Sequence, residues 1–279
     1  MNLLHALLLG LVQGLTEFLP VSSTAHLTLA EHLMLGRGMP LAFDVLLHVG
    51  TLLALCVYFR RELGQLLAGL LGRNAEGRRL ALLLVVAMVP TGVLGLATKA
   101  LKETQKGHLW LYGVFLLLTA GLLWAAQRLA ERRPGRPVEA LGAADALAVG
   151  AIQGLGGGFG LSRSGSTIAV GVFRGLALPA SARFSFLLGI PTIAAAALVE
   201  GRKLVKPLLH GQALPSDLAF PAGSASPVLL CGAGIAMAAV SGYLAIGLLD
   251  RFTRTPRLRG FAAYCMLAGV AALGFGLFR

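Results

Sequence analysis

Long apolar runs constrain this chain more than any other feature. The runs cover residues 41–59, 79–98, 108–127, 180–200, 227–249 and 259–278. Each approaches the ~20 residues that an α-helix needs to cross about 30 Å of hydrocarbon. Only 13% of the residues are charged, whereas a soluble domain carries about 25%. The short alternating segments of a transmembrane β-barrel are missing. The sequence therefore predicts an all-α, polytopic membrane protein with six full transmembrane helices.

Two further apolar regions, residues 1–36 and 139–175, are interrupted midway by a polar turn. Each half of such a region is too short to cross a bilayer. We therefore expect two re-entrant helical hairpins, each entering and leaving the membrane on the same side. Irregular backbone survives at that depth only where protein or water covers it. The alternative for each region is one kinked crossing helix.

The two interrupted regions also resemble each other. Residues 10–15 read GLVQGL and residues 150–155 read GAIQGL, and a hydroxyl-rich turn follows each. We infer one membrane domain, residues 1–279, built from repeats of about 1–135 and 139–279. Each repeat holds one hairpin and three crossings, and because three is odd the second repeat is inverted. Inverted repeats bring such turns together near the midplane, where binding sites lie.

The net charge of +12 is spread over short loops, with arginine clusters near residues 60–79, 128–136 and 251–259. Re-entrant hairpins place all three clusters on one side, which basic loops mark as cytoplasmic. No nucleic-acid-binding motif accompanies them, so nucleic acid is not an expected partner. Three cysteines in apolar spans are typical of small buried hydrophobes rather than of a disulfide or metal framework.

The first polar turn carries an acid at membrane depth. Gln13 and Glu17 are four residues apart, so they share a helix face. They also interrupt the first apolar run, which argues against a cleaved signal peptide. An unpaired carboxylate in lipid costs at least ~2.5 kcal/mol. Glu17 is therefore predicted to face a cation, a metal or a wet cavity, as a metal ligand or general base. A structural hydrogen bond across the hairpin is the alternative.

Hydroxyl groups and a histidine follow this acid. His26 follows Ser22 by four residues and Ser23 by three, on one helical face. A serine–histidine pair is a nucleophile–base arrangement, which makes Ser23 and His26 catalytic candidates. Ser22 and Thr24 are candidates for substrate contact. The simpler alternatives are a serine that caps the following helix and a histidine satisfied within the core.

The second polar turn resembles an anion site. Residues 162–167 read SRSGST and follow a glycine-rich run. Arg163 offers a bidentate fork to phosphate oxygens, and a helix that begins here directs free N–H groups at them. The expected substrate contacts are Ser162, Ser164, Gly165, Ser166 and Thr167, with Arg163 as a catalytic residue. Alternatively, the glycines allow tight packing, the serines cap the helix and Arg163 pairs with Glu17.

One more polar pair lies in the run 41–59. Asp44 and His48 are four residues apart and share a helix face. We expect both to support the site without contacting the reacting atoms.

These motifs resemble those of the undecaprenyl-diphosphate phosphatase family, membrane enzymes associated with bacitracin resistance. The first match is residues 13–26, QGLTEFLPVSSTAH, and the second is residues 160–167, GLSRSGST. Residues 184–188, FSFLL, form a third similar segment. Phe159 stands where the family normally has proline, and Gln13 where many members have a second glutamate. The resemblance covers nearly the whole chain in length and order.

The resemblance implies hydrolysis of a long-chain isoprenyl diphosphate to the monophosphate and inorganic phosphate, which recycles the lipid carrier of peptidoglycan synthesis. It also implies a multi-pass protein of the plasma membrane, a site that opens to the outer side, and a divalent metal, Mg²⁺ or Ca²⁺. Glu17 is the expected metal ligand, with Gln13 as a weaker one. The expected partners are the isoprenyl diphosphate and membrane lipids, and a homodimer is left open.

Two other functions fit the same sequence features. Inverted repeats and broken helices are also the architecture of secondary carriers, so a lipid-carrier flippase is one alternative. An inactive paralogue that binds lipid diphosphates is the other. For an active enzyme the nucleophile stays open between Ser23, His26 and an activated water.

Overall fold

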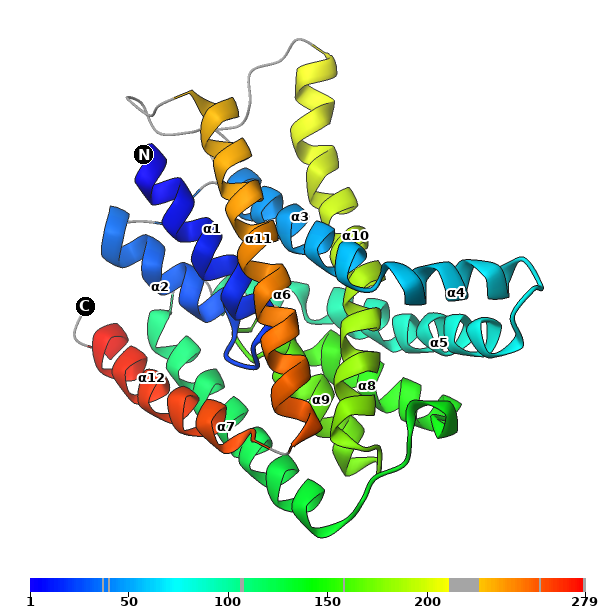
Figure 1. Ribbon diagram of the computed structural model, residues 1–279. Coiled ribbons are helices and arrows are strands. Elements are labelled where there is room, and N and C mark those ends of the chain that lie inside the picture. The colour runs from blue at the N-terminus through cyan, green and yellow to red at the C-terminus, as the bar shows by residue number, and fades with distance from the viewer. Residues whose placement is uncertain are drawn as a thin grey trace.

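The computed structural model describes residues 1–36, 38–39, 41–105, 108–157, 159–210, 226–255 and 257–277. The all-α prediction is confirmed, because these residues form helices and their only bridge is the isolated pair Arg136 and Leu176 (Figure 1). The first half contains α1 (Leu3–Phe18), α2 (Ser23–Leu35), α3 (Leu41–Tyr58), α4 (Arg60–Leu70), α5 (Ala75–Ala97), α6 (Lys99–Gln105) and α7 (Leu109–Arg132). The second half contains η1 (Val138–Ala140), α8 (Ala143–Gly156), α9 (Arg163–Phe173), α10 (Leu178–Leu209), α11 (Pro227–Arg254) and α12 (Arg259–Leu277).

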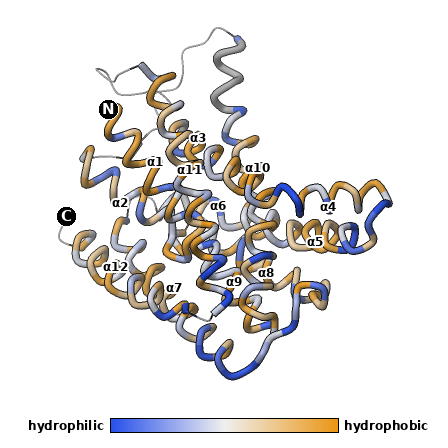
Figure 2. Tube along the Cα trace, viewed as in Figure 1, coloured by the Kyte–Doolittle hydropathy of each residue, from blue (hydrophilic) through white to orange (hydrophobic). Residues whose placement is uncertain are grey.

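Among the described residues, five helices are long and apolar enough to cross a membrane, namely α5, α7, α10, α11 and α12. The pair α3 and α4 adds a sixth if it counts as one span. Apolar residues predominate along the traces of these helices, and hydrophilic stretches lie at several of their ends (Figure 2). On α5, Val85, Val89 and Val93 lie on one face and are each about 60% exposed. Such a stripe needs lipid to cover it, so the prediction of a polytopic membrane protein is confirmed.

The structure corrects one detail of the first half. The sequence suggested a basic loop over residues 60–79, but the chain bends by 77° after α3 and continues as α4. Arg60 therefore begins a helix and Arg78 lies in the first turn of α5. The reason is that α4 has an apolar face that packs against α5. Gly69 permits this contact, since a Cβ atom there would lie 2.1 Å from the Arg78 nitrogen.

Local sequence explains both helix–turn–helix segments. Helix α1 ends before Pro20, which lacks an N–H group and restricts the residue before it. Ser22 caps α2 by accepting a hydrogen bond from the Ala25 nitrogen at 3.3 Å. Ser162 caps α9 in the same way through the Gly165 nitrogen at 3.1 Å. With 16 and 14 residues, α1 and α8 are about 24 and 21 Å long, too short for a ~30 Å crossing.

Both segments dock on the other half of the chain in the same manner. Helix α1 packs against α11, and α8 packs against α5. Ser241 of α11 donates a hydrogen bond to the Gly10 carbonyl at 3.5 Å. Thr91 of α5 donates one to the Gly150 carbonyl at 2.9 Å. Gly10 and Gly150 occupy matching positions of the two similar segments, so their equivalent surroundings support a duplication. The inverted orientation of the repeats stays a prediction.

The close approach of α8 to α5 gives a test of this packing. A Cβ atom at Gly150 would lie 2.0 Å from the Ala87 carbonyl oxygen, which is rigid backbone. We expect Gly150→Ala to destabilise the fold by about 1–3 kcal/mol, as overpacking does. The measurement is the thermal unfolding midpoint in detergent. Gly92→Ala on α5 is the control, since nothing lies within 4 Å of its added methyl group. Equal midpoints for the two variants would contradict the packing.

The three arginine clusters lie near one end of the bundle. Arg259, at the start of α12, pairs with Glu131 near the end of α7 at 2.7 Å. One cavity is lined by Glu62 of α4, Pro137 and Arg254 of α11. The chain segments that carry the three clusters therefore converge, as the hairpin topology predicts. Their assignment to the cytoplasmic side stays a prediction.

Candidate active site

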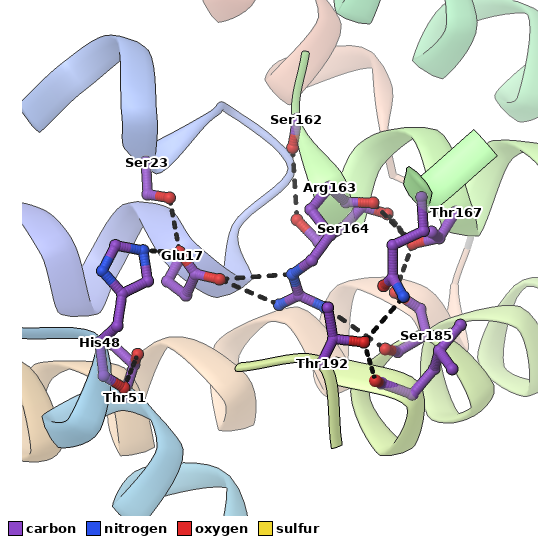
Figure 3. A network of polar contacts seen from close by, with 12 residues as sticks. Glu17, Ser23, His48, Thr51, Ser162, Arg163, Ser164, Thr167, Ser185 and Thr192 are labelled. Atoms are coloured by element: carbon purple, nitrogen blue, oxygen red, sulfur yellow. Dashed lines mark hydrogen bonds and ion pairs between the residues drawn. The ribbon is translucent and has the colours of Figure 1, made fainter. Parts of the chain in front are cut away.

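The two polar turns meet at an ion pair (Figure 3). Glu17 lies in the last turn of α1, and Arg163 is the first residue of α9. Nε and Nη2 of Arg163 each lie 3.3 Å from Oε1 of Glu17. The Glu17 side chain is 6% exposed and that of Arg163 is 12% exposed. Two charges buried to this degree stabilise each other, and the loss of either would leave the other unpaired in a poorly hydrated place.

The second carboxylate oxygen of Glu17 faces three other polar groups. Ser23 Oγ donates a hydrogen bond to Oε2 at 2.5 Å. Gln13 Nε2 donates to the same atom at 3.2 Å, and His48 Nε2 lies 3.8 Å from it. Oε2 therefore has a hydroxyl proton directed at it, which is the arrangement by which a carboxylate orients and accepts the proton of a nucleophile.

Arg163 is held from the other side by α10. Its Nη1 donates to the Ser185 carbonyl at 3.4 Å. Gly189 makes room for the guanidinium, since a Cβ atom there would lie 2.6 Å from Nη1. The hydroxyl groups of Ser185 and Thr167 are 2.6 Å apart and tie α10 to α9. Sequence analysis did not assign Ser185 or Gly189 to the site. Ser185 lies in the FSFLL segment, whose resemblance to the family could have indicated a role at the site.

A pocket of about 340 Å³ opens beside the ion pair. This volume falls in the range of small-molecule sites. Its lining is Glu17, Ser22, Ser23, Thr24, His48, Thr91, Gly95, Gln153, Gly154, Gly157, Leu161, Arg163, Thr192, Ile193 and Ala196. The structure therefore brings Glu17 and Arg163 to one cavity with Ser22, Ser23 and Thr24 of the first turn, together with His48.

The remaining candidates of the second turn lie outside this lining. Ser162, Ser164, Gly165, Ser166 and Thr167 are all buried. Ser164 donates to the Leu19 carbonyl at 3.2 Å, which ties the two turns together. The hydroxyls of Ser166 and Thr167 donate to the Arg163 carbonyl at 3.2 and 2.7 Å. In this structure these groups stabilise the turn that carries Arg163, and they do not line the pocket.

The expected pair of Ser23 and His26 is not formed in the described part of the chain. Ser23 donates to Glu17 instead. His26 Nδ1 lies 2.8 Å from the Ser22 carbonyl oxygen, and Nε2 lies 2.7 Å from the Tyr264 hydroxyl. Shared helical spacing placed the residues near each other, but both ring nitrogens have other partners. The structure therefore corrects the assignment of His26 as the partner of Ser23.

A second polar network lines the pocket, and the sequence analysis did not assign its residues to the site. Gln153 donates to the Thr192 hydroxyl at 2.9 Å and to the Thr91 hydroxyl at 3.3 Å. Gln153 occupies the same position in the second similar segment as Gln13 does in the first. That equivalence was the signal that could have assigned it to the site.

Asp44 does not line the pocket beside the ion pair. It lines a neighbouring pocket together with Glu31 and Tyr112. Thr24, His48 and Ala196 line both pockets, so the two are adjacent. The Asp44 carbonyl lies 2.7 Å from His48 Nδ1. Asp44 therefore contacts the His48 ring through its backbone carbonyl, whereas the His48 side chain itself lies 3.8 Å from Glu17.

Comparison with known proteins places this arrangement in a family. The family model for bacitracin resistance protein BacA matches residues 6–271. The chain belongs to the BacA family. It is 42% identical to the undecaprenyl-diphosphatase of Syntrophotalea carbinolica, over 96% of this chain and 97% of the relative. Identity is 40% to the undecaprenyl-diphosphatase of Desulfosudis oleivorans and 38% to that of Geobacter sulfurreducens, over 99% of this chain in both cases and 100% and 98% of the relatives.

The donors present in this BacA family member suit a metal that is shared with a substrate. Within the described residues, no three His, Cys, Asp or Glu side chains gather closely enough to hold an ion by themselves. Gln13 Oε1 is buried without a hydrogen-bond partner in that part of the chain, and Nε2 of the same amide contacts Glu17. Mg²⁺ is often held by one or two carboxylates with substrate phosphates and waters. One carboxylate and one free amide oxygen fit that mode.

Proposed function

We propose that this protein hydrolyses undecaprenyl diphosphate to undecaprenyl monophosphate and inorganic phosphate. The observation that carries the proposal is the Glu17–Arg163 pair at a pocket, with a serine hydroxyl 2.5 Å from the carboxylate. A guanidinium fork is the side chain best suited to a diphosphate. The chain matches the undecaprenyl-diphosphatases named above over nearly their full length, which supports the same reaction here.

The resting ion pair suggests how substrate binding prepares the site. The diphosphate competes with Glu17 for Arg163, because both present anionic oxygens to the guanidinium. Once Arg163 contacts phosphate, the carboxylate retains Ser23 and Gln13 as partners. Glu17 then accepts the Ser23 proton as Oγ attacks the terminal phosphorus. The bridging P–O bond breaks, and undecaprenyl monophosphate leaves.

The second half of the reaction restores the enzyme. Water attacks the phosphoserine, the Ser23 Oγ–P bond breaks as Glu17 returns its proton to Oγ, and inorganic phosphate leaves with both hydrogens of the water. Phosphoryl transfer of this kind depends mainly on positioning and charge stabilisation. Glu17 and Gln13 would hold a divalent metal, which would neutralise part of the diphosphate charge. Direct attack by water is the alternative, and mapping of a trapped phosphoenzyme distinguishes the two.

The site is proposed to open to the outer face of the plasma membrane. Along α10, residues 192–196 line the site, whereas residues 179–186 line the cavity at the arginine-rich end. The pocket therefore lies toward the end of α10 opposite the basic clusters. If these clusters face the cytoplasm, substrate enters from outside, and its isoprenyl tail stays between helices in the lipid.

The test is phosphate release by the purified, detergent-solubilised protein from undecaprenyl diphosphate, with and without a divalent metal. We expect catalytic release of one phosphate per lipid. A pure lipid transporter releases no phosphate in this assay. Transport needs two compartments separated by a membrane, which detergent removes, whereas hydrolysis does not. Tight binding of the lipid without turnover would instead select an inactive paralogue and overturn the proposal.

A further inference from the structure

The residue before Ser23 has an unusual backbone conformation. Ser22 has φ of 72°, and every other described residue with positive φ is glycine. A non-glycine residue in such a conformation costs of order 1–3 kcal/mol and persists only where its surroundings hold it. Because Ser22 directly precedes Ser23, this conformation sets the direction in which the Ser23 hydroxyl points. The contacts that hold Ser22 therefore bear on the site.

Besides the helix cap to the Ala25 nitrogen, a histidine contacts Ser22, and a tyrosine in turn contacts the histidine. The Ser22 carbonyl oxygen lies 2.8 Å from His26 Nδ1 and also accepts the His26 backbone N–H at 3.2 Å. On the far side of the ring, His26 Nε2 lies 2.7 Å from the hydroxyl of Tyr264 on α12. The two rings stack, with centroids 5.5 Å apart and planes 17° from parallel.

Proton positions follow from the chemistry of these partners. A carbonyl oxygen only accepts hydrogen bonds, so Nδ1 must carry the proton in the bond to Ser22. In the neutral ring Nε2 is then the acceptor, and the Tyr264 hydroxyl donates to it. The lone pair that a general base would use is thus occupied by Tyr264. His26 is fixed as a donor to backbone and is not poised to take the Ser23 proton.

Helix α12 reaches the same turn at a second point. Cys265, the neighbour of Tyr264, is buried and donates a weak hydrogen bond from Sγ to the Pro20 carbonyl at 3.4 Å. Two consecutive residues of α12 therefore contact the first hairpin, Tyr264 at His26 of α2 and Cys265 at Pro20 between α1 and α2. The Cys265 contact is independent of the His26 ring and fixes α12 against the turn.

We propose that Tyr264 is a positioning residue that acts through His26. Its hydroxyl selects the His26 tautomer that donates to the Ser22 carbonyl, and this bond keeps Ser22 at positive φ and Ser23 directed at Glu17. The inference rests on the proposed function, in which Ser23 is the nucleophile. It assigns a role in that reaction to a side chain on the last helix, 238 residues from His26.

Tyr264→Phe tests the hydroxyl while keeping the stacked ring. Loss of one hydrogen bond, about 0.5–1.5 kcal/mol, corresponds to a decrease in kcat of roughly 2- to 13-fold, with KM unchanged because neither ring lines the pocket. The matched control is Tyr243→Phe on α11, a tyrosine of similar exposure that packs on Tyr58. Equal kcat values for the two variants would overturn the proposal.

Substitution of His26 separates positioning from proton transfer. An asparagine amide can replace the Nδ1 donor but cannot act as a base. We expect His26→Asn to retain at least about tenfold more activity than His26→Ala, because only the former keeps a side-chain donor to the Ser22 carbonyl. If His26 were the base or the nucleophile, both variants would lose activity equally, by about 10²–10⁴-fold for a base. That result would overturn the proposal.

A spectroscopic readout does not depend on turnover. With selectively ¹⁵N-labelled histidine, the His26 signal is identified as the one that His26→Asn removes among the six histidines. We expect the Nδ1–H tautomer in the native protein and an increased Nε2–H population in Tyr264→Phe. A native Nε2–H tautomer would overturn the proposed positioning. If the native protein released no phosphate while its tautomer were as expected, the proposed function would fail and the His26–Tyr264 geometry would stand.

Discussion

Arg163→Ala is expected to lose at least about 3 kcal/mol of transition-state stabilisation, roughly 10²-fold in kcat/KM, as when one oxyanion donor is removed. Arg163 is the only arginine or lysine that lines the described pocket. Phosphoryl transfer needs charge neutralisation at the phosphate oxygens, and no other arginine or lysine of this lining can replace the missing fork. The measurement is phosphate release by purified protein at saturating and at limiting lipid concentration.

Two companion variants sharpen this result. Arg163→Lys keeps the charge but loses the bidentate fork, so its activity should fall between those of the native protein and the alanine variant. Arg183→Ala removes a cation from α10 at the arginine-rich end, where Arg183 lies 3.9 Å from Glu62 and from Glu139. We expect near-native turnover from that control. Near-native turnover of folded Arg163→Ala would refute the role of Arg163 at the phosphate.

Glu17→Gln is expected to lower turnover by at least about 10²-fold, the lower bound for loss of a general base. The substitution keeps the size of the side chain but removes the group that accepts the Ser23 proton. It also removes the one carboxylate among the residues lining the pocket. We therefore expect the remaining activity to be insensitive to added Mg²⁺ or Ca²⁺, whereas native activity falls in a chelator titration.

Glu31→Gln is the matched control for Glu17→Gln. Glu31 is also buried, at 4% exposed, and lies on the second helix of the same hairpin. Its carboxylate accepts the Met39 backbone N–H at 3.0 Å and does not line the pocket beside Arg163. We expect this variant to keep its metal response. Metal-dependent turnover that survives in Glu17→Gln would argue against Glu17 as a ligand.

The sequence predicted the membrane class and the residues of the ion pair. Five apolar runs correspond to long helices, because a segment that crosses lipid must satisfy its own backbone hydrogen bonds and a helix does so. The cost of a buried charge also required a partner for Glu17, and Arg163 was a candidate for it. The sequence alone did not predict the bend after Tyr58. The bend lets the apolar face of α4 pack against α5, and this packing is a tertiary contact that the sequence pattern does not show.

Side-chain directions were the least predictable part of the site. Helical spacing placed His26 near Ser23, but the ring contacts Tyr264, which is remote in the chain. Spacing likewise suggested that Ser166 and Thr167 contact substrate, whereas both hydroxyls donate to the Arg163 carbonyl. Serine and threonine in a first helical turn have such backbone acceptors within reach. Packing against α10 adds one further partner, the Ser185 hydroxyl, which lies 2.6 Å from that of Thr167.

The central claim is that the two turns form one site through Glu17 and Arg163. A double-mutant cycle of Glu17→Gln and Arg163→Ala on the free energy of unfolding in detergent tests it most directly. Because each single change leaves a buried group without its partner, we expect both to destabilise the protein. We expect the double variant to recover at least about 2 kcal/mol relative to the sum of the single effects. A coupling free energy near zero would show that the two side chains do not meet, and would contradict the account.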